Sequence, residues 1–186
     1  MNLKLVLLAL PVFVAGCSLL PPDMRMGAAP SRVVVASTPF TAVERDFVTR
    51  VATKEVYEIE VSKLAVEKGM TPAVRDFAQT MVSHHTRMSD ELIEIMSAHG
   101  VPPPKGLPAD RATKLHRLAA LPKSDAFDSG FIRVVGIEDH RSAIAMFEKA
   151  RAQVRDRDLR AYIDRSLTIM RVHLTMAQNV AASMAG

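Results

Sequence analysis

Hydrophobic residues recur every three or four positions through four long stretches of the chain, at about residues 41–68, 72–98, 124–154 and 159–184. Spacing of this kind places an apolar stripe along one side of an α-helix. No segment alternates hydrophobic and polar residues for long enough to predict a β-strand. The pattern therefore predicts an all-α protein built from four long helices.

Capping residues define where the first two helices are expected to begin and end. Thr41 and Glu44 form a Ser/Thr-x-x-Glu capping box, and Gly69 ends the helix that they begin. Thr71 followed by Pro72 is an N-cap with proline at the first helical position. Because only a few residues join the two helices, we expect them to lie antiparallel.

The connection between the second and third long helices is the longest of the three. The run Pro102-Pro103-Pro104 excludes a continuous helix there, and residues 108–120 predict a short crossing helix. Ser124 then caps the third long helix, and a turn at residues 155–158 leads into the fourth. The expected fold is an antiparallel four-helix bundle with a short extra helix between helices 2 and 3.

The N-terminus has the features of an export signal. Residues 1–16 carry one basic residue, Lys4, before an apolar run that is too short to span a membrane. The run ends in Val14-Ala15-Gly16-Cys17, which resembles the bacterial lipobox, whose cysteine receives a diacylglyceryl group and becomes the mature N-terminus. Ordinary cleavage nearby, with Cys17 left as a free thiol, is the alternative. Cys17 is the single cysteine, which excludes an internal disulfide and a cysteine-rich metal cluster.

The residues after the cysteine are expected to form a tether. Ser18 stands where many lipoproteins retained at the inner membrane have Asp, so the lipobox resemblance implies an acylated outer-membrane lipoprotein that faces the periplasm. Residues 17–40 contain four prolines among small residues, a composition typical of linkers. We therefore expect a signal peptide at 1–16, the lipidated cysteine and tether at 17–40, and the bundle at 41–184.

Composition and charge narrow the class of protein further. Hydrophobic residues make up 48% of the 186 positions and charged residues 24%, which excludes wholesale disorder and a multispanning membrane protein. The net charge is +4, but basic and acidic residues alternate along the chain. The sequence therefore indicates no nucleic-acid partner, and the membrane reached through the lipid is the one partner it implies.

Ionisable residues interrupt the apolar stripe of every long helix. They are Glu58 in the first helix, His85 in the second, His140 in the third and His173 in the fourth. Counted from the turns near residues 70 and 156, the glutamate and the three histidines lie within about one helical turn of the same depth. They are therefore expected to converge in the middle of the bundle.

Convergence of these side chains favours a metal site over isolated core histidines. Four buried polar groups without partners would cost about 1–3 kcal/mol each, so they must satisfy one another, bind water or share an ion. Three imidazoles and one carboxylate suit Zn²⁺, Fe²⁺, Mn²⁺ or Cu²⁺. The predicted ligands are Glu58, His85, His140 and His173.

Other polar residues have supporting roles in this hypothesis. His84 is expected to face the rim of the bundle, Asp139 could orient His140, and Glu55 is an alternate carboxylate one turn from Glu58. His99 and His116 fall in or near the connection between helices 2 and 3 and are expected to be solvated.

A di-iron carboxylate site is excluded because its Glu-x-x-His pairs are absent. The residues three positions before the core histidines are Val82, Ile137 and Met170. The sequence therefore favours a mononuclear, histidine-rich site.

Several segments resemble a bacterial family of exported, ferritin-like four-helix proteins that is described as a domain of unknown function and often as an outer membrane protein. The matching pieces are Glu58 to Ala65, Phe77 to Val82 with His85, Ala126 to Asp128 with Asp139-His140, and Leu167 to Leu174. The resemblance covers about residues 42–182 and implies a ferritin-like bundle with the four predicted ligands at its recurrent polar positions. Two residues depart from the family pattern: His84 replaces an Asp, and Thr168 replaces a frequent proline.

Three classes of function remain open at this stage. The leading hypothesis is a lipid-anchored protein that binds one transition-metal ion in the bundle core. The second is a metal-free envelope protein, structural or interacting, whose histidines form a hydrogen-bonded layer. An enzyme is the least supported, because there is no Ser-His-Asp arrangement and no glycine-rich phosphate loop.

Overall fold

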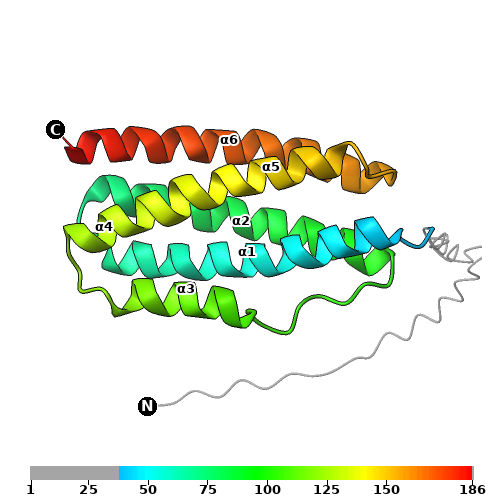
Figure 1. Ribbon diagram of the computed structural model, residues 1–186, viewed down its shortest axis with the longest axis horizontal. Helices are drawn as coiled ribbons and strands as arrows, with labels where there is room; N and C mark the ends of the chain where they lie inside the picture. The colour runs from blue at the N-terminus through cyan, green and yellow to red at the C-terminus, as the bar shows by residue number, and fades with distance from the viewer. Residues whose placement is uncertain (1–37, 186) are drawn as a thin grey trace, which may run out of the picture. The chain divides into compact units, whose positions relative to one another are not determined.

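The computed structural model describes residues 38–185, and Figure 1 shows these residues as a bundle of long helices. The elements in chain order are α1 (Ala42–Lys68), α2 (Pro72–Ala98), α3 (Ala109–Ala120), α4 (Asp125–Phe131), the π-helix η1 (Ile132–Asp139), α5 (His140–Arg151) and α6 (Arg157–Ala185). No strand occurs within residues 38–185, and the predicted all-α, antiparallel four-helix bundle is confirmed. The predicted signal peptide, Cys17 and nearly all of the tether lie outside the described residues.

Four long helical columns run side by side in Figure 1, and α4, η1 and α5 together form the third of them. The short helix α3 lies along the outer side of α1, at the position that the sequence predicts for the crossing helix. Lys68 at the end of α1 donates to the carbonyl of Ala119, at 2.6 Å, and to that of Leu121. These hydrogen bonds attach the segment between α2 and α4 to the end of α1.

Two buried carboxylates join the turns at opposite ends of the bundle. Glu44, in the capping box of α1 with Thr41, also accepts from the backbone amides of residues 155–156 at 2.8 and 2.9 Å. Asp128 in α4 accepts from the backbone amides of residues 70–71 at 2.9 and 3.0 Å. Each carboxylate satisfies amides that would otherwise lack a partner at a helix end.

His99 is half-buried with its side chain only 5% exposed, which corrects the expectation that it is solvated. Its ring stacks on Phe40 with centroids 3.8 Å apart, and its Nδ1 donates to the carbonyl of Thr38 at 2.7 Å. The chain just before α1 folds back over the C-terminal end of α2 and covers the ring. His116 in α3 is exposed, as expected.

The third column is not one continuous α-helix, because residues 132–139 adopt the wider π form. Hydrogen bonds in a π-helix reach one residue further along the chain, which changes the positions that face inward. Val135 is fully buried before His140, whereas Ile137, which the α-helical spacing predicts to face the core, is only half-buried. At Gly136 an added Cβ would lie 2.7 Å from the Cβ of Ala177, so glycine permits the close approach of η1 to α6.

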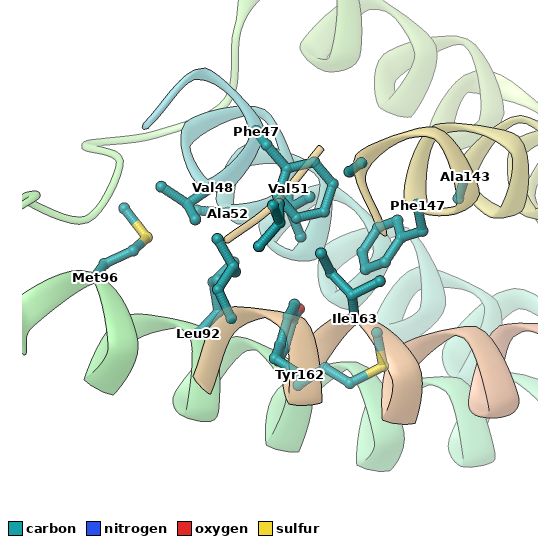
Figure 2. Packing of buried hydrophobic residues seen from close by; sticks show 14 of the residues in the cluster. Phe47, Val48, Val51, Ala52, Leu92, Met96, Ala143, Phe147, Tyr162 and Ile163 are labelled. Carbon is teal, nitrogen blue, oxygen red and sulfur yellow. The ribbon is translucent and has the colours of Figure 1, made fainter. Parts of the chain in front are cut away.

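The core consists of two apolar clusters with a layer of polar residues between them. Figure 2 shows the cluster nearer the α5–α6 turn, here called the Phe147 cluster, where the rings of Phe47 and Phe147 meet edge to face at 5.1 Å. The second, here called the Phe77 cluster, gathers residues nearer the α1–α2 turn: Tyr57, Val61, Ala65, Val74, Phe77, Ala78, Met81, Leu118, Phe127, Phe131, Ile132, Val135 and Ala177. The polar layer between them comprises Lys54, Glu55, Glu58, His84, His85, His140 and His173.

Candidate metal centre

Three histidines from three different helices meet in the polar layer. His85 on α2, His140 at the start of α5 and His173 on α6 are each no more than 1% exposed. One nitrogen from each ring can be chosen so that all three nitrogens lie within 4.8 Å of one another. The ring centroids are 5.3 to 5.7 Å apart. The predicted convergence of these three residues is therefore present in the structure.

Each of the three rings is fixed by a hydrogen bond at one nitrogen, which leaves its other nitrogen for a metal ion. His85 Nδ1 lies 2.7 Å from Glu55 Oε2, and His140 Nδ1 lies 2.9 Å from the carbonyl of Val135. Carboxylates and backbone carbonyls are the usual partners of metal-binding histidines, because they fix the ring orientation and the tautomer. In both residues the other nitrogen, Nε2, is left to bind an ion.

The third ring, His173, bridges two other histidines. Its Nε2 lies 2.8 Å from His84 Nδ1, and its Nδ1 lies 3.2 Å from His140 Nε2. The Val135 carbonyl can only accept, so His140 donates from Nδ1 and its Nε2 accepts. Without a metal, His173 must then donate from Nδ1 to His140 and accept at Nε2 from His84.

A bound ion would reverse the hydrogen bond between His84 and His173 and replace the one between His173 and His140. His173 Nδ1 would offer its lone pair to the ion, so the proton of His173 would lie on Nε2 and be donated to His84 Nδ1. Both histidines change tautomer in this step, and neither gains or loses a net charge. His84 would then accept a hydrogen bond from His173, as Glu55 accepts one from His85.

The pKa values of these histidines favour neutral rings at three of the four positions. Burial, together with the positive charge of neighbouring groups, lowers the pKa of His140 to about 4 and that of His173 to about 2. Burial and Arg87 also lower the pKa of His84. For His85, burial acts to lower the pKa, but the adjacent Glu55 carboxylate outweighs it and raises the pKa. A neutral imidazole is the form that binds metals.

Glu58 is fully buried beside the histidines, but it does not belong to their close group. Its Oε1 accepts from the ammonium of Lys54, one helical turn earlier on α1. Burial alone would raise the pKa of Glu58, but the charges of Lys54, His140 and His85 lower it to about 2. The structure therefore gives an ionised carboxylate that is paired with Lys54, where the sequence predicted a fourth ligand in the histidine group.

Two atoms of the polar layer have no hydrogen-bond partner among the described residues: His85 Nε2 and Glu58 Oε2. A buried polar atom in this state costs about 1–3 kcal/mol, so a missing ligand or water is indicated. Three nitrogens around a tetrahedral ion at about 2.0–2.1 Å would lie about 3.3 Å apart. The nitrogens His140 Nε2 and His173 Nδ1 already lie 3.2 Å apart, and the group as a whole lies within 4.8 Å.

Asp139 does not orient His140, in contrast to the expectation from the sequence. It accepts from Lys114 of α3 at 2.5 Å, and the carbonyl of Val135 takes the place beside the imidazole. Consecutive residues on a helix do not face each other, so the Asp139 carboxylate points toward α3 and not toward the imidazole of His140.

Sequence reasoning missed the roles of Lys54 and the Val135 carbonyl. Lys54 left a clear signal, since it interrupts an apolar stripe four positions before Glu58, a spacing at which opposite charges pair on a helix. The one signal for the π-helix was Gly136, an isolated glycine inside a helical pattern.

Comparison with known families gives a clear assignment. Residues 29–180 match the family described as Domain of unknown function (DUF4142). The chain belongs to this family. No curated protein matches the chain significantly. The expected membership in a family of unknown function is confirmed, and the family description names no activity.

A solved structure supports the fold. A crystal structure of a DUF305 fragment from Deinococcus radiodurans aligns with a TM-score of 0.68 and 18% sequence identity, covering 78% of this chain and 99% of that fragment. At this identity the likeness concerns the fold alone.

Within residues 38–185, every helix is too short or too polar to span a membrane.

Proposed function

We propose that this protein binds one transition-metal ion through His85, His140 and His173, with the Glu58 carboxylate supplying negative charge beside the ion. The observation that carries the proposal is the pairing of the rings. Each histidine is fixed at one nitrogen by Glu55, the Val135 carbonyl or His84, and the remaining nitrogens face one another. A set of buried imidazoles with such partners is typical of a metal site.

The donor set suits Zn²⁺, Fe²⁺ or Cu²⁺. Imidazole nitrogen binds all three, whereas Mg²⁺ and Ca²⁺ prefer oxygen ligands. The role we propose is metal storage, sensing or structural support, in a protein of unestablished activity.

Metal-dependent stabilisation tests the proposal. The chain is purified without an affinity tag, stripped with a chelator and melted with and without Zn²⁺, Cu²⁺ or Fe²⁺. An ion that binds only the folded state adds about 2.7 kcal/mol to the free energy of unfolding at a free concentration one hundred times its dissociation constant. We expect a rise in melting temperature for the wild type and for His116→Ala, an exposed histidine of α3, and none for His85→Ala. An unchanged melting temperature with all three metals would refute the proposal.

A second candidate is a metal-free envelope protein whose histidines form a polar layer that fixes the register of the helices. The chain of hydrogen bonds from His84 through His173 and His140 to Val135 favours it, because these groups satisfy one another without an ion. This candidate leaves His85 Nε2 and Glu58 Oε2 without partners. It predicts that stability depends on pH and does not depend on metal.

We also propose that the protein is a lipoprotein, acylated on Cys17 and anchored to the outer membrane on its periplasmic side. The support is the lipobox-like sequence and Ser18 after the cysteine. Cell fractionation and labelling with a palmitate analogue test it. The wild type should incorporate the label and sediment with outer membranes, and Cys17→Ala should do neither. A labelled Cys17→Ala protein, or an unlabelled wild type, would contradict the anchor.

A further inference from the structure

A lysine buried beside three histidines is unexpected in a site for a cation. The side chain of Lys54 is 7% exposed and that of Glu58 is fully buried, and the two form an ion pair inside the polar layer. Removing two charges from water is costly, and a positive charge near the histidines also repels a metal ion.

The position of Glu58 shows what the lysine does. The three histidines form a group of nitrogens within 4.8 Å of one another, and Glu58 has no oxygen in that group. Its Oε1 is bound to Lys54, which lies four residues earlier on the same helix. The ion pair therefore ties one oxygen of the carboxylate to Lys54 and keeps it outside the close group of nitrogens.

We propose that Lys54 keeps Glu58 out of the coordination shell, so that an ion on His85, His140 and His173 retains one open position for a small anionic ligand. This inference rests on the proposed metal site. Three protein ligands with an open fourth position distinguish reactive or exchangeable zinc-type sites from closed structural ones. Lys54 is thus a positioning residue that acts through Glu58.

A surface hollow lies next to His84, the histidine that contacts His173. His84 is half-buried and lines this hollow of about 320 Å³ together with Arg87, Glu91 and Arg165. Arg165 pairs with Glu91, and Arg87 donates to the backbone carbonyl of Ser83. Two guanidinium groups and one carboxylate thus line the hollow, and their net positive charge attracts anions, which fits a small anionic ligand.

The Co²⁺-loaded, full-length protein provides the test, with azide as the probe of the open position. Azide should change the visible Co²⁺ spectrum of the wild type. In Lys54→Met, Glu58 should become the fourth ligand. The affinity for Co²⁺ and Zn²⁺ should then rise at least about tenfold, equivalent to about 1.4 kcal/mol, and the azide response should disappear.

Three further variants separate this effect from general changes in charge or packing. Lys54→Met combined with Glu58→Gln should lose the gain in affinity and regain the azide response, because the carboxylate is gone. Lys54→Arg keeps the positive charge and should respond to azide like the wild type. Lys63→Met removes a lysine from an exposed pair with Glu60 on the same helix and should change neither property.

The outcomes show separately whether the inference about Lys54 fails or the proposed metal site fails. A wild type that binds none of Zn²⁺, Cu²⁺, Fe²⁺ and Co²⁺ refutes the proposed function. A wild type that binds Co²⁺ but shows no azide response, or whose Lys54→Met variant shows no gain in affinity, overturns the inference and leaves the metal site standing. If Lys54→Met fails to fold without metal, we expect Zn²⁺ during refolding to restore its helical circular dichroism, since the ion replaces the missing positive charge. Failure of that rescue would also overturn the inference.

Discussion

The Phe147 cluster and the polar layer are neighbours in one bundle, but they are built on different principles. The cluster is filled by side chains such as Phe47, Phe147 and Leu159, which contribute through burial and close packing. The polar layer fills the same cross-section with charged and imidazole groups that must find partners. The first region therefore supplies stability, and the second carries the features expected of a function.

Replacing a ring in the Phe147 cluster should have the largest effect on stability. Phe147 is fully buried against Phe47 and Tyr162, so Phe147→Ala removes buried apolar area and leaves a cavity. We expect a loss of about 3–5 kcal/mol in the free energy of unfolding, measured by urea denaturation. The affinity for Zn²⁺ should be unchanged at temperatures where the variant is folded. A large loss of affinity would show that the two regions are not separate.

Adding one methyl group at Gly136 should affect both regions. The new Cβ of Gly136→Ala would lie 2.7 Å from Ala177 and 3.3 Å from Phe77, so η1 and α6 must move apart. Overpacking of this kind costs about 1–3 kcal/mol. Because η1 leads directly into His140, we also expect weaker Zn²⁺ binding by isothermal titration calorimetry. Arg171→Ala, on the exposed face of α6 two residues from His173, is the control and should change neither value appreciably. Unchanged stability and affinity in Gly136→Ala would contradict the close contact.

Acid should destabilise the metal-free protein through the polar layer. The pKa values of His140 and His173 are lowered to about 4 and about 2 in the folded state, so below the ordinary value of 6.5 the unfolded chain binds more protons. Their contribution to stability is present above pH 6.5 and is lost as the pH falls toward the folded values. Each should contribute a loss of about 1.4 kcal/mol per pH unit within its window.

Urea denaturation in the presence of a chelator, at about pH 7, 6 and 5, measures this dependence. His140→Gln should show a shallower dependence than the wild type, and His116→Gln should not differ from it. The pKa of His85 is raised, so its contribution has the opposite sign and is lost as the pH rises through the folded value. A His140→Gln protein with the full wild-type dependence would show that this histidine is not held neutral by burial.

The same contrast explains how much could be predicted from the sequence. Both ends of α1 and the start of α2 follow from Thr41, Gly69, Thr71 and Pro72, because capping and proline geometry act within a few residues. The convergence of His85, His140 and His173 follows from helical periodicity and short turns, which fix the depth of a residue in an antiparallel bundle.

The remaining features depend on contacts between helices. The π-helix at 132–139 arises where Gly136 allows η1 to approach Ala177 of α6. The hydrophobic periodicity of one helix carries no information about its distance from another helix. Glu55 is the carboxylate that contacts His85, while Glu58, which lies deeper in the stripe, is paired with Lys54. Which of two carboxylates one turn apart reaches a histidine depends on how α1 is rotated against α2. The roles of the polar residues were therefore predicted less well than their positions.

The metal content of the protein as isolated from its native envelope tests the central claim most directly. The account predicts about one transition-metal ion per chain by elemental mass spectrometry of untagged protein, and none in a variant that combines His85→Ala with His173→Ala. A wild type that carries no metal, and takes up none when dialysed against Zn²⁺, Cu²⁺ or Fe²⁺, would contradict it.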